Sequence, residues 1–303
     1  MNFKVKKRTG SLLLSLALIL TMIVVLLSGC SGKEKKDSFV VVTSFYPMYV
    51  FTENIVDGLG DIELKNLTQP QTGCLHDYQM KPSDMSALEE ADLFIVNGAG
   101  MESFIDKVKK AYPKLKIVEA SNNIQLLKDK NGEMNPHVWV GVSNAIEEVK
   151  NITDALISAK PENKDEFLKN ETAYLSRLEE LKVKMHKALA KYKGNKIVTF
   201  HEAFPYFAEE FDLIIASVIE REPGSEPSAS ELAQTIDIVN ASGLKALFSE
   251  PQYSSRTADV ISRETGAKIY TLDPFVTGTV GTGKDAYEKT MEENLKVLIE
   301  AFK

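Results

Sequence analysis

The sequence predicts an α/β fold with two lobes, each with a mainly parallel sheet flanked by helices, joined by one long linker helix. The first observation is that short apolar runs alternate with helical patterns in residues 39–160, and that this alternation returns in residues 195–303. Strand–helix–strand order favours parallel strands with helices on both faces of a sheet. The second observation is one long helical pattern in residues 161–194, which separates the two halves.

The N-terminal lobe, residues 39–160, should contain four strands and four helices. Its strands are expected in short apolar or alternating runs at 39–43, 62–67, 93–96 and 116–119. Its helices are expected at 46–58, 83–90, 103–111 and 143–158. Ser83 or Asp84 should cap the second helix and Ser143 the fourth, because their side-chain oxygens can accept hydrogen bonds from the first free amides.

The linker segment, residues 161–194, has the spacing of a single amphipathic helix. Its apolar residues fall mostly three or four positions apart, at Phe167, Tyr174, Leu175, Leu178, Leu181, Met185, Leu189 and Tyr192. Pro161 suits a first helical turn and Gly194 suits a C-terminal stop. A helix of about 33 residues would be ~48 Å long, enough to span two lobes and hold them at a fixed separation.

The C-terminal lobe, residues 195–303, should repeat the same strand–helix order. Strands are expected at 196–200, 213–218, 245–248 and 268–272. Helices are expected before 211 and at 228–242, 255–265 and 284–302. Ser228 or Ser230 should cap the second of these helices.

Residues 1–29 have the pattern of a bacterial lipoprotein signal peptide. Four cationic residues between 4 and 8 precede an uncharged apolar run from 11 to 27, and Leu27-Ser28-Gly29-Cys30 places small residues before a cysteine. Cys30 would become the acylated first residue, followed by a flexible tether that ends at residue 38 (residues 30–38). The alternative is an uncleaved membrane anchor, because the apolar run is almost long enough to span a bilayer. Both interpretations place the rest of the chain outside the cytoplasm, attached to the cell membrane at its extracellular or periplasmic face.

The charge balance argues against nucleic acid as a partner. The chain has a net charge of −7, and removing the four cations of residues 1–29 leaves −11. Nucleic acid binding needs a basic face, which this composition does not favour. An acidic surface is compatible with attracting cations, although solubility alone explains it equally well.

Four side chains follow predicted strands and form the candidate metal site. His201 and Asp273 stand at the C-terminal ends of strands, and His76 and His137 lie in loops between strands and helices. Ligand sites of open α/β sheets collect at the carboxyl ends of strands, so these residues should converge in the cleft between the lobes. Three neutral imidazoles and one carboxylate make a tetrahedral set suited to Zn²⁺.

Several residues offer alternatives to this assignment. Asp273 also fits a simple Asp-Pro turn, and Glu250 and Glu202 are competing carboxylates that could instead orient a ligand imidazole. Cys74 lies two residues before His76 and would be a thiolate ligand, but a small unpaired side chain in a loop is the simpler interpretation. His186 lies mid-helix away from the apolar stripe, and we expect it to be solvated.

Two motifs resemble catalytic sequences but depart from them. His201-Glu202 lacks the second histidine of a zinc-protease helix, since Pro205 stands in its place. Residues 278–284 match a phosphate-binding loop, but the next residue is Asp285 where Ser or Thr is needed for magnesium. We interpret this segment as a glycine-rich loop beside the Asp273 turn.

The whole mature chain resembles the metal-binding lipoproteins of bacterial ABC importers, in the zinc and manganese group. The resemblance rests on Cys30 and on short motifs at 43–47, His76 with 82–84, 97–98, 136–139, His201, 226–228 and 272–274. It implies two α/β lobes joined by a rigid helix, with His76, His137, His201 and Asp273 as ligands. Zinc-type members have histidine at the third position, so His201 favours zinc. Two departures are the lack of a carboxylate among residues 78–82 and the lack of a histidine-rich tract before His137.

The expected function is therefore binding, and we do not expect an enzyme. The protein should be a monomeric lipoprotein that binds one Zn²⁺ and passes it to a membrane permease driven by a cytoplasmic ATPase. Three alternatives remain at this point: the same role for Mn²⁺ or Fe²⁺, a zinc hydrolase with an open coordination position, and a surface adhesin stabilised by metal.

Overall fold

The computed structural model describes residues 38–69, 72–128, 132–219, 227–252, 255–279, 281 and 283–303. The expected signal peptide, Cys30 and most of the tether lie outside these residues, as do Glu226, Val280 and Thr282. Residues Phe39–Lys303 form one compact unit that contains two four-stranded sheets. No helix within the described ranges is long and apolar enough to cross a membrane.

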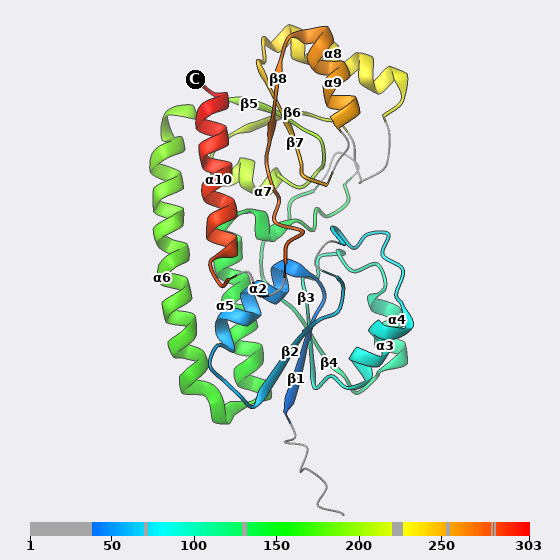
Figure 1. The fold of residues 1–303 in the computed structure, drawn as a ribbon, viewed down its shortest axis with the longest axis vertical. Coiled ribbons are helices and arrows are strands. Elements are labelled where there is room, and N and C mark those ends of the chain that lie inside the picture. Colours follow the sequence, from blue (N-terminus) through cyan, green and yellow to red (C-terminus); the bar gives the residue numbers. More distant parts are fainter. Residues whose placement is uncertain are drawn as a thin grey trace, which may run out of the picture. The chain divides into compact units, whose positions relative to one another are not determined.

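The N-terminal sheet has the strand order β2-β1-β3-β4, and all of its pairings are parallel. Its strands are β1 (Phe39–Thr43), β2 (Ile62–Asn66), β3 (Leu93–Val96) and β4 (Lys116–Glu119). The intervening helices are α2 (Tyr46–Ile55), α3 (Pro82–Glu89) and α4 (Ile105–Ala111). Figure 1 shows α2 beside one face of the sheet and α3 and α4 beside the other, as right-handed crossovers require.

The C-terminal sheet repeats this order as β6-β5-β7-β8, again with parallel pairings. Its strands are β5 (Lys196–Thr199), β6 (Ile214–Val218), β7 (Ala246–Ser249) and β8 (Lys268–Thr271). Its helices are α7 (Pro205–Glu210), α8 (Ala229–Ser242), α9 (Ser255–Thr265) and α10 (Ala286–Ala301). The predicted α/β class with two mainly parallel sheets is confirmed.

A long helix separates the two sheets in chain order, as the apolar spacing predicts, and Figure 1 shows it running alongside both lobes. It consists of α6 (Lys164–Leu189), with a 3₁₀ turn at Pro161–Asn163 and another at Ala190–Tyr192. Its buried residues include Phe167, Tyr174 and Leu178, which pack in one core with α5 (Val142–Ala159), α2 and α10. The regular α-helix is therefore shorter than the expected 33-residue helix, because the chain tightens at both ends.

Two predicted helix caps are wrong, and their causes differ. α3 begins after Lys81, not at Ser83 or Asp84, and the Asp84 carboxylate accepts a hydrogen bond from the Lys81 amide at 2.7 Å. α5 begins after Gly141, and the amide and hydroxyl of Ser143 both donate to the carboxylate of Glu210. At α3 the N-cap amide binds the carboxylate three residues later, as in a capping box, whereas at α5 the Ser143 groups bind a carboxylate that is distant in sequence. At α8 the expected cap holds, because Ser228 and Glu231 form a reciprocal capping box.

Candidate metal site

The loop between β2 and α3 carries Cys74 and His76 on either side of a buried leucine. Leu75 is fully buried. Its amide donates to the Met101 sulfur at 3.4 Å, and its carbonyl accepts from the Ser103 hydroxyl at 3.2 Å. Anchoring Leu75 in this way fixes where its two neighbours lie.

His137 lies at the start of a 3₁₀ turn, Val138–Val140, and is only 2% exposed. Its Nδ1 is 3.1 Å from the Asn135 side-chain oxygen, which also accepts from the His137 amide at 3.0 Å. The Asn135 amide nitrogen donates to the Glu202 carbonyl at 2.7 Å, so the oxygen is the atom that faces His137. Nδ1 therefore carries the proton, and Nε2 presents its lone pair on the other side of the ring.

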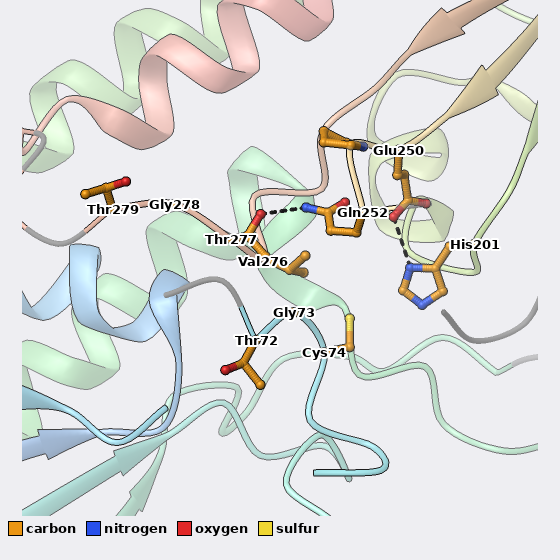
Figure 2. A pocket seen from close by; sticks show the side chains of 11 residues that line it. Thr72, Gly73, Cys74, His201, Glu250, Gln252, Val276, Thr277, Gly278 and Thr279 are labelled. Carbon is orange, nitrogen blue, oxygen red and sulfur yellow. Dashed lines mark hydrogen bonds and ion pairs between the residues drawn. The ribbon is translucent and has the colours of Figure 1, made fainter. Parts of the chain in front are cut away.

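His201 follows β5 in the C-terminal lobe and is 1% exposed. Its Nδ1 lies 3.3 Å from the Glu250 carboxylate, which follows β7 and is also buried (Figure 2). A carboxylate beside one ring nitrogen fixes the orientation of an imidazole and makes the other nitrogen a better metal ligand. This contact is compatible with the orienting role that the sequence left open for Glu250.

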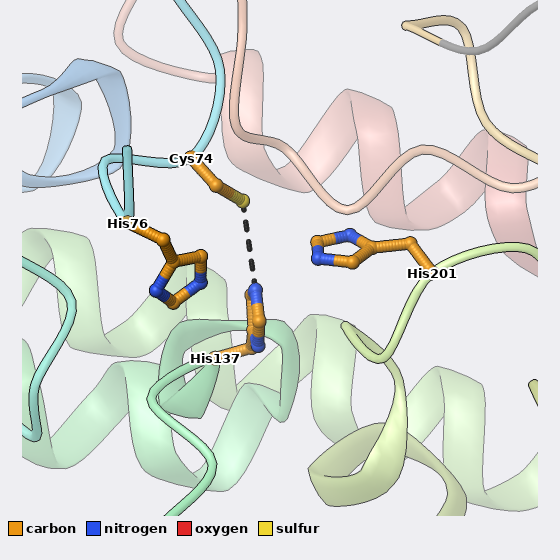
Figure 3. Close-up of side chains that lie close together, drawn as sticks. All are labelled: Cys74, His76, His137 and His201. Carbon is orange, nitrogen blue, oxygen red and sulfur yellow. Dashed lines mark hydrogen bonds between the residues drawn. The ribbon is translucent and has the colours of Figure 1, made fainter. Parts of the chain in front are cut away.

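The three histidines and Cys74 form one group of metal-ligating side chains. One ligand atom from each of Cys74, His76, His137 and His201 lies within 4.8 Å of the others. The His137 ring centroid is 5.4 Å from that of His76 and 4.6 Å from that of His201. Figure 3 shows the four side chains pointing toward a common centre, with His201 entering from the C-terminal lobe. Imidazole nitrogen and cysteine sulfur are the donor atoms that tetrahedral zinc sites use.

Burial favours the neutral, metal-binding form of His76 and His137. Burial lowers the pKa of His76 to about 4, with a smaller contribution from His201. Burial also holds the pKa of His137 well below its usual value, again with His201 and His76 acting in the same direction. A neutral imidazole keeps the lone pair that coordinates a cation. His76 and His137 therefore do not need to lose a proton before they bind metal at neutral pH.

Asp273 stands directly after β8, as expected, but it is not a member of this four-residue group. One carboxylate oxygen of Asp273 accepts from the Phe275 amide at 2.8 Å, and Asn294 bonds both backbone groups of Asp273. Burial raises the pKa of Asp273, and Glu250 raises it further. The next residue, Pro274, accepts a hydrogen bond from the Trp139 indole at 2.8 Å, which ties the Asp273 turn to the His137 turn.

Two cavities adjoin the group. The larger, of about 540 Å³, is lined by residues that include Cys74, His201, Glu250 and Gln252 (Figure 2). The other, of about 210 Å³, is lined by His76, His137 and Glu202 among others. Glu202 therefore borders the site, while its carbonyl holds Asn135 in place.

The structure places Cys74 inside the group, whereas a small unpaired side chain in a loop was the simpler interpretation of the sequence. The available signal was its position two residues from His76, since alternate residues of an extended segment share one side. His186 is also not simply solvated. Its Nε2 is 3.4 Å from the Glu210 carboxylate and its ring packs on Phe211, although the side chain is 44% exposed. His186 does not belong to the group of metal-ligating side chains.

Part of the segment that resembles a phosphate loop has a packing explanation. A Cβ atom at Gly278 would collide with the Tyr46 ring, so glycine is required there for close approach. Residues 280 and 282 of this segment lie outside the described ranges.

Comparisons with known proteins agree with the fold and with a metal-binding function. The family model for zinc-uptake complex component A, periplasmic, matches residues 41–301. The high-affinity zinc uptake system protein ZnuA of Bacillus subtilis is 32% identical over 291 residues, covering 88% of this chain and 89% of that protein.

Two solved structures are similar at comparable identity. The Zn(II)-bound structure of AdcA from Streptococcus pneumoniae has a TM-score of 0.77 at 29% identity and covers 87% of this chain, which spans only 57% of that chain. The structure of FpvC from Pseudomonas aeruginosa in complex with Mn²⁺ has a TM-score of 0.78 at 29% identity, covering 87% of this chain and 98% of that chain. Because similar folds carry different metals, the donor atoms must decide the preference of this chain.

Proposed function

The chain belongs to the family of periplasmic zinc-uptake components, and on that premise we propose that it captures Zn²⁺ outside the cytoplasm and delivers it to an ABC permease. The family is one of solute-binding proteins, and such proteins work with a membrane permease and an ATPase. The single observation that carries the choice of cargo is the group of three imidazoles and a thiol with ligand atoms within 4.8 Å of one another. Nitrogen and sulfur donors suit zinc, whereas manganese prefers oxygen.

His76, His137 and His201 are the proposed metal ligands common to every version of this site. Two of them are held through Nδ1 by Asn135 or Glu250, which leaves Nε2 for the ion. The fourth position has two candidates: Asp273, from the turn after β8, and Cys74, which is already within the group. Glu202 and Glu250 serve as orienting residues in this proposal.

The membrane attachment is proposed from the sequence alone. Cys30 would carry the lipid, and residues 30–38 would act as the tether for a monomeric binding protein. Anchoring would keep the captured ion close to the permease without placing any protein segment in the bilayer. Metabolic labelling with a radioactive fatty acid would test this, and a Cys30→Ser variant that still incorporated label would contradict it.

The zinc assignment can be tested by titrating the purified full chain with Zn²⁺ and with Mn²⁺ under calorimetry. Trp139 is the only tryptophan, and its ring lies 5.4 Å from that of His137, so its fluorescence should report binding directly. We expect one tightly bound Zn²⁺ and weaker Mn²⁺ binding. Tight Mn²⁺ with weak Zn²⁺ would transfer the proposed role to manganese.

Two histidine variants provide a matched comparison for that titration. His137→Ala should abolish tight zinc binding, because it removes a buried ligand. His186→Ala removes an imidazole that contacts Glu210 and Phe211 and lies outside the metal-ligating group, and it should leave both stoichiometry and affinity unchanged. Equal effects from the two changes would mean that the group around His137 is not the binding site.

A further inference from the structure

Cys74 is the one thiol within the described residues, and the only other cysteine in the chain is Cys30. It is not an isolated surface thiol. Its Sγ lies 3.5 Å from His137 Nε2, and it belongs to the same group as His76 and His201. Figure 3 shows it facing the three rings from the loop that also carries His76.

The orientation of the His137 ring determines which nitrogen faces the Cys74 sulfur. Asn135 holds Nδ1 as a donor, so Nε2, the atom nearest to Sγ, is an acceptor. Without metal, the thiol can donate to this lone pair. With metal, the lone pair and the sulfur can both point at one ion between them.

The observed separation fits the second arrangement without rearrangement of either residue. Zn–N bonds of about 2.0–2.1 Å and a Zn–S bond of about 2.3 Å at tetrahedral angles place sulfur and nitrogen about 3.5–3.6 Å apart. The sulfur and nitrogen here are 3.5 Å apart.

Asp273 and Glu250 each use one carboxylate oxygen on a group other than the proposed ion. One oxygen of Asp273 accepts from the Phe275 amide, and Asp273 is outside the group. Glu250 uses one oxygen on His201 Nδ1 and so orients a ligand. Cys74 is thus the fourth donor that the described residues place closest to the three imidazoles.

Resting on the zinc-capture function proposed above, we propose that Cys74 is a thiolate ligand, which makes the site Cys-His₃ and selects thiophilic cations. On binding, the Sγ–H bond gives its proton to solvent and a sulfur–metal bond forms. Sulfur is a soft donor that suits Zn²⁺, Cd²⁺ and Cu⁺ and suits Mn²⁺ poorly. Cys74 is therefore the residue that separates zinc from manganese in this chain.

Cobalt substitution tests this directly on the purified full chain. Co²⁺ bound by a thiolate has an intense sulfur-to-metal charge-transfer band in the near ultraviolet, and Co²⁺ bound only by nitrogen and oxygen lacks it. We expect the band in the wild type and its loss in Cys74→Ser. Cys30→Ser removes the other cysteine of the chain and should leave the band intact.

Calorimetry on the same variants measures the selectivity. Cys74→Ser should weaken Zn²⁺ binding by roughly 100-fold. This loss is at least as large as the loss expected on removal of a residue that only orients a ligand. Mn²⁺ affinity should change by much less, so the preference for zinc over manganese should fall.

The outcomes separate this inference from the function on which it rests. A wild type that binds no Zn²⁺ overturns both. A wild type that binds Zn²⁺ tightly but shows no sulfur band with Co²⁺, together with a Cys74→Ser variant of unchanged affinity, overturns the thiolate alone. Loss of Zn²⁺ in Asp273→Asn with none in Cys74→Ser would assign the fourth position to Asp273 instead.

Discussion

β1 and β5 occupy the same place in their two sheets, each between the second and third strands of its own lobe. The packing around the sheets differs. A single large core includes the N-terminal sheet, α2, α5, α6 and α10, and it reaches one face of the C-terminal sheet through Ile197 and Phe248. The opposite face, through Val198 and Leu247, packs on a smaller separate core under α8 and α9. Alternate residues of β5 and β7 thus belong to different cores.

The lobes also hold their imidazoles differently. In the N-terminal lobe a neutral amide, Asn135, orients His137, whereas in the C-terminal lobe a buried carboxylate, Glu250, orients His201. One repeated topology thus supplies two differently packed halves to the same site. Three sets of substitutions should have effects of decreasing size.

Cavities in the two cores should have unequal consequences. Leu178→Ala in α6 should lower the free energy of unfolding by about 2–5 kcal/mol, because it empties space in the core shared by both lobes. Ile261→Ala in α9 should cost about 2 kcal/mol and should mainly speed hydrogen exchange in α8 and α9. Urea unfolding and amide exchange would measure both. Equal acceleration of exchange throughout the protein by Ile261→Ala would contradict a separate outer core.

Removing the two orienting side chains should weaken zinc binding unequally. Glu250→Ala should reduce affinity by about 10- to 100-fold, because His201 loses a charged acceptor, and Asn135→Ala should reduce it by about 10-fold or less. Glu250→Gln keeps an oxygen acceptor without the charge and should fall between wild type and Glu250→Ala. Zinc competition titrations would rank the three, and an Asn135 effect larger than that of Glu250 would reverse the comparison.

The smallest effect concerns Glu148, a fully buried residue of α5. Neither of its carboxyl oxygens has a hydrogen-bond partner among the described residues, and burial, followed by the nearby Glu102, raises its pKa well above the usual value. A group with a raised folded-state pKa stabilises the fold at pH values below its unfolded pKa, and this contribution is lost as the pH rises through the folded value.

Glu148→Gln should therefore stabilise the protein at pH 8 by about 1 kcal/mol, with a smaller gain at pH 5. Denaturant unfolding at the two pH values would measure it. Glu147→Gln, one position away on the exposed side of the helix, is the matched control and should change stability by less than about 0.5 kcal/mol. A destabilised Glu148→Gln at pH 8 would show that the carboxylate is needed in its ionised form.

Strand positions were predictable because short runs such as 93–96 and 116–119 carry their own pattern, and β3 and β4 match those bounds. The first residues of the helices were less predictable. The Ser143 amide and hydroxyl bind Glu210, which is 67 residues away, and no local motif encodes such a partner. Local sequence patterns predict the helix, but they do not predict the distant side chain that binds the free groups at its first turn.

The same distinction applies to the site. Placing histidines after strands followed from the geometry of parallel sheets, and that rule anticipates the approach of His76, His137 and His201 to one another. The position of Cys74 depends on how Leu75 is anchored by Met101 and Ser103, a contact between two loops that the sequence does not reveal. Asp273 as a ligand remains a prediction.

The donors of the group come from three separate stretches of chain, and Cys74 and His137 alone are 63 residues apart. An unfolded chain therefore cannot assemble them, and Zn²⁺ binds the folded state almost exclusively. By mass action, free zinc at 100 times the dissociation constant would add about 2.7 kcal/mol to the folding free energy. Resistance to proteolysis thus becomes a readout of metal supply, with empty molecules degraded first when zinc is scarce.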